Sequence, residues 1–152
     1  IFRDLKPDNV GFTHDHIIKL FDFGLARELK PERRMGRHQF FLSRAGSPRY
    51  MAPEVMRSNP YGLPADVFSL SILLYEMSHL KKPFRSLKMQ GAREGNPNME
   101  KETKTIQANS KGSQKTNEKV LETHANERPD MSDCYRALGS FLELNQISIE
   151  NS

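Results

Sequence analysis

Four polar residues near the start of this 152-residue chain have the types and spacing that phosphoryl transfer needs. Asp4, Lys6 and Asn9 stand at i, i+2 and i+5, and Asp22 follows Asn9 by thirteen residues in a Phe-Asp-Phe-Gly run. In such a set, one carboxylate orients the attacking hydroxyl and accepts its proton, and one cation offsets charge on the phosphoryl oxygens. The amide and the second carboxylate supply hard oxygen ligands of the kind that magnesium prefers.

Two short strands joined by a polar turn are predicted to follow the first three of these residues. Val10–Phe12 and Ile17–Phe21 have the β-branched and aromatic composition of strands. The turn between them contains His14 and His16, whose ring nitrogens can bind metals. Two histidines in a polar turn with one aspartate are more often exposed to solvent, and we favour that interpretation.

A buried helix is predicted over residues 66–77. Pro64 stands just before it, where the missing N–H costs little, and Asp66 is a candidate N-cap. Apolar residues recur at helical spacing and cover most sides of the helix: Val67, Phe68, Leu70, Ile72, Leu73, Leu74, Tyr75 and Met77.

A second, amphipathic helix is predicted after Asp130, which is a plausible cap. Its apolar positions are Met131, Cys134, Tyr135, Leu138, Phe141 and Leu142. Because Cys134 is the only cysteine, an internal disulfide is excluded, and we expect this residue to pack as a small apolar side chain.

Four ordered motifs resemble those of eukaryotic protein kinases of the serine/threonine type. Arg-Asp-Leu-Lys-Pro alone is typical of a charged turn. Four motifs in the same order as in the family are not explained by a chance match. They are the catalytic loop Phe2–Asn9 with the magnesium loop Asp22–Gly24, the Ala-Pro-Glu motif Met51–Glu54, the start of the central helix Asp66–Leu70, and the Arg-Pro motif Glu127–Pro129.

The resemblance implies a role for each of the polar residues. Asp4 is the catalytic base, Lys6 contacts the transferring phosphate of ATP, and Asn9 and Asp22 bind Mg²⁺. The predicted hairpin forms the floor of the nucleotide site. Gly11 stands there where the family packs an apolar side chain under the adenine.

Three aromatic residues bear on two departures from the family pattern. Phe2 replaces the usual histidine, and we expect it to fill the same apolar slot against Phe23. The lack of a side chain at Gly11 removes apolar contact, at roughly 25 cal/mol per Å². Phe12 is the candidate to compensate.

Residues 24–53 read as one long basic loop that resembles the activation segment, with a helical turn at Leu25–Leu29. Ser43 lies where the family often carries a regulatory phosphosite, with Arg3 as the receiver of the phosphate; a plain loop serine is the equally weighted alternative. The Ser47 hydroxyl would bridge the catalytic aspartate and lysine, as in serine/threonine kinases.

Three further residues receive structural roles from the resemblance. Glu54 and Arg128 would form a buried ion pair, which would be costly to break from one side. Asp66 would hold the backbone of the catalytic loop, a role compatible with capping its own helix.

The expected fold class is α+β, mainly α: a kinase-like large lobe with a small β-hairpin and a buried central helix. Residues 1–85 form the core, 121–146 hold the C-terminal helix and 147–152 a tail. Residues 86–120 lack apolar periodicity and are expected to be disordered; a degenerate insert, a species-specific loop and a mistaken reading frame all remain open. The chain opens on Ile1 without the family's Gly-rich loop, strand lysine or helix glutamate, so we expect a large-lobe fragment lacking the small lobe.

The net charge of +4 and the pI of about 9.3 are compatible with nucleic-acid binding. The excess of positive charge is spread along the chain and is densest in the segment that resembles the activation segment. This distribution argues against a nucleic-acid partner. No apolar run has the length of a membrane span, so a cytoplasmic or nuclear location is expected.

The sequence therefore predicts a protein serine/threonine kinase that uses ATP and Mg²⁺, with a protein substrate and with the oligomeric state left open. The fragment alone is expected to be inactive. The alternatives are a non-catalytic, pseudokinase-like interaction module and a gene fragment that never folds alone.

Overall fold

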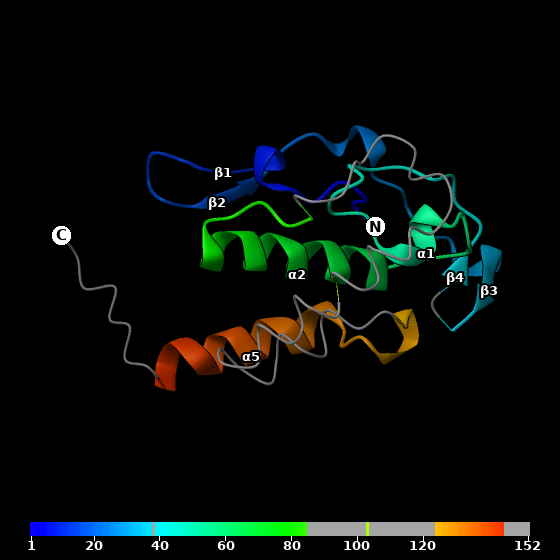
Figure 1. The fold of residues 1–152 in the computed structure, drawn as a ribbon. Helices are drawn as coiled ribbons and strands as arrows, with labels where there is room; N and C mark the ends of the chain where they lie inside the picture. Colours follow the sequence, from blue (N-terminus) through cyan, green and yellow to red (C-terminus); the bar gives the residue numbers. More distant parts are fainter. Residues whose placement is uncertain (38, 85–102, 104–123, 145–152) are drawn as a thin grey trace.

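Helix α2 lies at the centre of the computed structural model, which describes residues 1–37, 39–84, 103 and 124–144. In Figure 1 the β1–β2 hairpin lies on one side of α2 and α5 on the other, with α1, β3 and β4 near its N-terminal end. The elements are β1 (Val10–Phe12), β2 (Ile18–Leu20), β3 (Arg34–Gly36), β4 (Gln39–Phe40), α1 (Pro53–Met56), α2 (Pro64–His79) and α5 (Met131–Leu144), with single 3₁₀ turns at Pro7–Asn9, Phe23–Leu25, Pro31–Arg33 and Ala125–Glu127. Among the described residues, helices and antiparallel strands both occur, as expected for a mixed fold.

The predicted hairpin is present as β1 paired antiparallel with β2. Its register places Val10 opposite Leu20 and Phe12 opposite Ile18. The histidines of the turn are exposed, as expected, and His14 lies 2.5 Å from the carboxylate of Asp15. No cluster of three potential metal ligands occurs among the described residues.

Helix α2 begins two residues earlier than predicted. Pro64 is its first residue, where a missing N–H leaves no hydrogen bond unmade. Asp66 is therefore the third helical residue, and the prediction that it caps α2 is wrong; no side chain caps this helix. Burial is strongest from Ala65 to Leu73, whereas Met77 is 60% exposed.

The main apolar core forms between α1, α2 and the segment that follows α2. Phe68 and Ile72 have no exposed surface, and they pack with Val55 and Met56 of α1 and with Phe84. A second, smaller contact joins α2 to α5 through Val67 and Cys134. Cys134 is 3% exposed, which confirms its expected packing.

Helix α5 has the predicted cap. The backbone N–H of Asp133 donates to the Asp130 carboxylate at 2.8 Å, which satisfies one of the N–H groups that a helix start leaves unpaired. The apolar stripe is only partly covered, because Tyr135 is 79% exposed.

The segment of residues 24–53 is not one long loop, contrary to the prediction. Strands β3 and β4 form a second antiparallel hairpin with an irregular register, and the helical turn lies at Phe23–Leu25 rather than at Leu25–Leu29. Backbone hydrogen bonds of 2.9 and 3.1 Å join Phe40 of β4 to Tyr61. This bridge joins residues 21 positions apart and stabilises the two short strands. The local sequence of the strands does not indicate it.

Most of the segment 86–120 and all of the tail 147–152 lie outside the described residues. Thr103 is the exception in the first of these, and it is fully buried. The described helices include none that is both long and apolar enough to span a bilayer.

The C-terminal part is fastened to α1 by a bidentate ion pair. Both terminal nitrogens of Arg128 donate to the Glu54 carboxylate, at 2.6 and 2.9 Å, and one also donates to the Pro64 carbonyl oxygen at 3.0 Å. The Arg128 side chain has no exposed surface, and its guanidinium lies 5.0 Å from the centre of the Phe68 ring.

We predict that Glu54→Gln lowers the free energy of unfolding by about 3 kcal/mol, because it removes the Glu54 carboxylate from the buried charge of Arg128. Chemical denaturation of the full natural polypeptide measures this change. Glu32→Gln, the same substitution at an exposed site, is the control and should cost less than about 0.5 kcal/mol. Equal stability of the two variants would contradict a structural role for the pair.

Candidate active site

Three groups converge on the carboxylate of Asp4, which is 8% exposed. The Lys6 ammonium lies 2.9 Å from Oδ2, and the side-chain amide of Asn9 donates to the same oxygen at 3.1 Å. The backbone N–H of Ser47 donates to Oδ1 at 2.7 Å. The spacing i, i+2, i+5 thus places all three side chains together, because the 3₁₀ turn Pro7–Asn9 brings Asn9 back towards Asp4.

Asp4 is held in its ionised form. Burial raises the pKa of its carboxyl, but the hydrogen bonds from Lys6 and Ser47 together outweigh burial and leave the pKa below the ordinary value of 3.8. The hydrogen bond to Asp4 correspondingly raises the pKa of the Lys6 ammonium. At neutral pH the site therefore offers a carboxylate that accepts protons, beside a fixed positive charge.

Asn9 and Asp22 are linked through the backbone. The N–H of Phe21 donates to the Asn9 carbonyl oxygen at 2.9 Å, so Asp22 immediately follows a residue bound to Asn9. Asp22 has φ 55° and is exposed, and its Oδ1 accepts the Gly24 N–H at 3.2 Å. A left-handed conformation is uncommon for residues other than glycine but is tolerated by aspartate.

This pair offers oxygen ligands that fit magnesium. The Asn9 amide nitrogen donates to the Asp4 carbonyl oxygen at 2.9 Å and to its carboxylate, which leaves the amide oxygen available as a ligand. Asp22 adds a carboxylate that is open to solvent. One carboxylate and one amide suffice for an ion that usually keeps several waters and shares its remaining positions with substrate phosphates.

Ser47 connects the segment of residues 24–53 to Asp4 and Lys6. Besides the contact of its N–H with Asp4, its hydroxyl accepts a hydrogen bond from the Lys6 ammonium at 2.9 Å. The preceding Gly46 has φ +112°, and a Cβ there would lie 2.3 Å from the carbonyl oxygen of Arg3. Only glycine permits this close approach of the two backbones.

Arg3 is 7% exposed and has φ 74°. Its guanidinium donates to the carbonyl oxygens of Leu25 and Ser43, at 2.6 and 3.2 Å, and to the hydroxyl of Tyr61 at 3.2 Å. The Ser43 hydroxyl is 3.4 Å from the same guanidinium. Arg3 and Ser43 therefore meet, as the sequence suggested, and Tyr61 is a third partner that the sequence did not indicate.

Asp66 contacts the catalytic loop from α2. Its two carboxylate oxygens accept the backbone N–H groups of Phe2 and Arg3, at 2.7 and 2.8 Å. Phe2 also packs edge-to-face on Phe23, with ring centres 5.2 Å apart, so the expected aromatic contact is present.

The expectation that Phe12 compensates for Gly11 is wrong. Phe12 is 66% exposed, whereas the ring of Phe21 occupies the position that a side chain at Gly11 would need: an added Cβ would lie 2.6 Å from its edge. The cause is the hairpin geometry, which the spacing of apolar residues does not encode.

Two residues at the site were missed by sequence reasoning. Gly46 had a usable signal, because a glycine between a loop and a hydroxyl residue often marks a close backbone approach. Tyr61 had none, since it reaches Arg3 only through tertiary folding.

Comparison with known proteins relates this geometry to a family. The pattern of the protein kinase domain matches residues 1–138. Dual specificity protein kinase shkB of Dictyostelium discoideum is 42% identical over 84 residues, which cover 55% of this chain and 12% of that protein. Rhodopsin kinase GRK1 of Rattus norvegicus is 41% identical over 57% of this chain and 14% of its own length.

Serine/threonine-protein kinase Nek3 of Oryza sativa subsp. japonica is 40% identical over 90 residues, which are 59% of this chain and 14% of that protein. The matched part of this chain therefore spans only 12–14% of the length of these relatives. Because the family pattern covers most of the chain, the chain belongs to the protein kinase domain family.

Proposed function

We propose that this chain carries the catalytic loop of a protein serine/threonine kinase, which transfers a phosphoryl group from ATP to a hydroxyl of a protein substrate with the help of Mg²⁺. The observation that best supports this proposal is the ionised, nearly buried Asp4 with Lys6, Asn9 and Ser47 around it. Such a carboxylate can orient a hydroxyl and accept its proton, and the adjacent ammonium offsets charge on the transferred group.

Asn9 and Asp22 would hold the metal ion, whose charge neutralises the phosphate oxygens when it is bound. The remaining work falls to this chain's own residues. Lys6 holds a positive charge beside Asp4, and Ser47 fixes both side chains from the activation segment. A serine hydroxyl in this position favours serine and threonine as the accepting residues, by resemblance to the family.

The non-catalytic alternative, an interaction module, predicts that these polar residues bind no metal and move no proton. Lys6 and Asn9 both contact the Asp4 carboxylate. Asp22 follows a residue whose N–H is bonded to Asn9, and this arrangement favours catalysis.

We predict that Asp4→Asn lowers kcat about a hundredfold or more and leaves ATP affinity nearly unchanged, because the carboxylate acts on the accepting hydroxyl. Asp22→Asn should in addition weaken ATP binding that depends on Mg²⁺. Steady-state kinetics and ATP titration on the full natural polypeptide measure both effects. The same turnover in Asp4→Asn and in the parent would refute the assignment.

We also predict that phosphorylation of Ser43 raises kcat/KM about tenfold, because the added phosphate gains charge-assisted hydrogen bonds to the nearby guanidinium of Arg3. Arg3→Ala should remove this gain, and Ser58→Ala, a change at an exposed serine elsewhere, should retain it. If Ser43→Ala alters neither activity nor the protease sensitivity of residues 24–53, Ser43 is a plain loop serine.

Residues 1–152 in isolation are expected to transfer phosphate only slowly. Asp22 and several apolar side chains of the hairpin, including Phe12 and Ile18, are exposed, so a nucleotide bound there would be covered by the described residues from one side only. Positioning errors of about 1 Å can cost on the order of a hundredfold in rate. Robust phosphorylation of a peptide by the isolated chain, lost on Asp4→Asn, would show this expectation to be wrong.

A further inference from the structure

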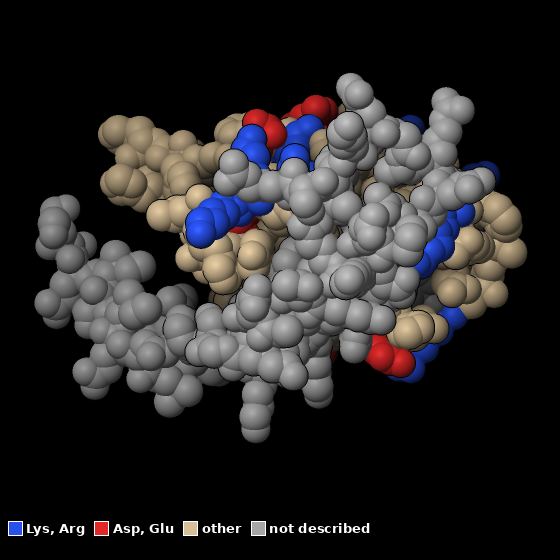
Figure 2. All heavy atoms as spheres, viewed as in Figure 1, with Lys and Arg blue, Asp and Glu red and all other residues tan. Residues whose placement is uncertain are grey.

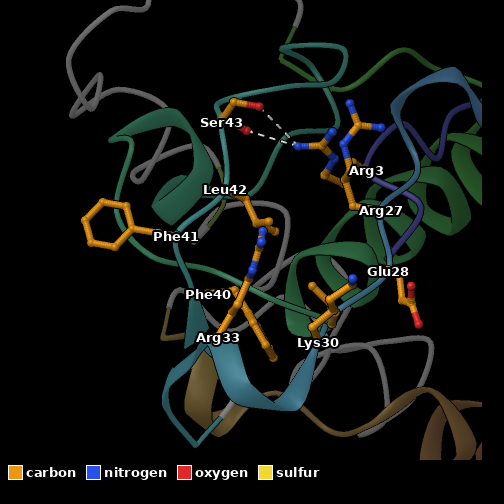
Figure 3. A pocket seen from close by; sticks show the side chains of 10 residues that line it. Arg3, Arg27, Glu28, Lys30, Arg33, Phe40, Phe41, Leu42 and Ser43 are labelled. Atoms are coloured by element: carbon orange, nitrogen blue, oxygen red, sulfur yellow. Dashed lines mark hydrogen bonds between the residues drawn. The ribbon is translucent and has the colours of Figure 1, made fainter.

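A cavity of about 610 Å³ lies beside the catalytic loop, between Arg3 and the β3–β4 hairpin. It is called the basic cavity below, and its lining residues are Arg3, Arg27, Glu28, Leu29, Lys30, Arg33, Phe40, Phe41, Leu42 and Ser43. In Figure 3, Arg3 and Arg27 lie near Ser43, and Arg33 and Lys30 lie on the other side of Leu42.

Positive charge in the basic cavity is not neutralised by the described part of the chain. None of its four cationic side chains forms an ion pair with a carboxylate of a described residue. Arg3 is nearly buried, yet the hydrogen bonds from its guanidinium to described residues all go to neutral oxygens, and only its backbone N–H meets a carboxylate, that of Asp66. Among the described residues of the lining, Glu28 is the only acidic one, and no ion pair joins it to these cations. A buried charge without a counter-charge is costly, so an anionic ligand would stabilise the site.

The surrounding surface has the same sign. Residues 27–49 contain seven arginines and lysines but only two glutamates, in a chain whose net charge is +4. Figure 2 shows Lys and Arg atoms along the edge of the molecule where β3 and β4 lie. A charged surface of this kind raises the local concentration of acidic ligands and speeds their association.

The basic cavity lies within reach of a substrate at the catalytic site. Arg3 lines the cavity and directly precedes Asp4 in the chain, so the cavity borders the loop that carries the proposed base. An extended peptide advances about 3.3 Å per residue. We therefore expect an acidic side chain a few residues along the substrate from the accepting hydroxyl to enter the cavity.

We infer that Lys30 and Arg33 recognise an anionic side chain of the protein substrate, either a carboxylate or a phosphate, and so give the enzyme a preference for acidic sequences. This inference rests on the proposed function and specifies its substrate class. A phosphate on Ser43 of the same chain would offer the same chemistry at the other side of Leu42. The experiment distinguishes an anion on the substrate from a phosphate on Ser43.

The test compares two fluorescent peptides that contain one central serine and differ only by three Glu→Gln substitutions around it. Their affinities for the full natural polypeptide are measured by fluorescence anisotropy without ATP. The glutamate peptide should bind about tenfold more tightly, and Lys30→Gln/Arg33→Gln should abolish that preference. Lys81→Gln/Lys82→Gln removes the same charge just beyond the C-terminal end of α2, and this matched control should keep the preference.

Two further forms of the protein show whether the anion comes from the substrate or from a phosphate on Ser43. The preference should persist in Ser43→Ala and in protein phosphorylated on Ser43. Its loss on phosphorylation would mean that the chain's own phosphate fills the cavity, and would overturn the inference. Equal binding of both peptides, equal loss in the control, or tighter Lys30- and Arg33-dependent binding of a single-stranded RNA would also overturn it.

Phosphoryl transfer is measured separately, so that failure of the inference and failure of the proposed function are distinguished. Equal phosphorylation of both peptides at saturating ATP would remove the acidic preference and leave the kinase assignment intact. Selective binding of the glutamate peptide without phosphate transfer would remove the kinase assignment and leave the recognition of acidic sequences intact.

Discussion

The carboxylate of Asp66 is the contact on which the candidate site depends. Each of its oxygens accepts one backbone N–H of the catalytic loop, from Phe2 and Arg3, and the residue is 8% exposed. Asp66 lies in the first turn of α2, where the positive end of the helix dipole favours a negative charge. Because α2 is anchored in the apolar core through Phe68 and Ile72, the loop inherits the rigidity of that core.

This anchoring explains how the site holds unfavourable backbone conformations. Arg3 has φ 74°, which costs on the order of 1 kcal/mol or more for a residue other than glycine. It is fixed by Asp66 at its N–H and by neutral oxygens around its guanidinium. Gly46 then brings the activation segment against the Arg3 carbonyl oxygen, so that Ser47 reaches Asp4. The position of the segment that contains Gly46 and Ser47 and the geometry of Asp4, the proposed base, are thus mechanically linked.

Local pattern predicted the elements whose stability is local. The apolar spacing of α2, the β-branched strands of β1 and β2, and the cap at Asp130 all lie within short windows of sequence. The β3–β4 hairpin was missed because its strands have only three and two residues, and its anchor is the bridge from Phe40 to the distant Tyr61.

The candidate site divides in the same way. The spacing of Asp4, Lys6 and Asn9 indicated that they would meet, because one 3₁₀ turn joins them. The contacts from Ser47 and Asp66 required resemblance to a family, since more than forty residues of chain separate them from the loop. Neither the residue spacing nor the family resemblance indicated the packing of Phe21 on Gly11, because this contact depends on side-chain direction within the hairpin.

The most direct test of this account is the kinetics of Asp66→Asn in the full natural polypeptide, with folding verified by thermal unfolding. The substitution places an NH₂ group where an acceptor oxygen meets a backbone N–H, so the loop loses one support while the polar residues remain. We predict that kcat falls about a hundredfold while the KM for ATP changes little, as expected for a displacement of the proposed base by about 1 Å. A folded Asp66→Asn protein with the kcat of the parent would contradict it.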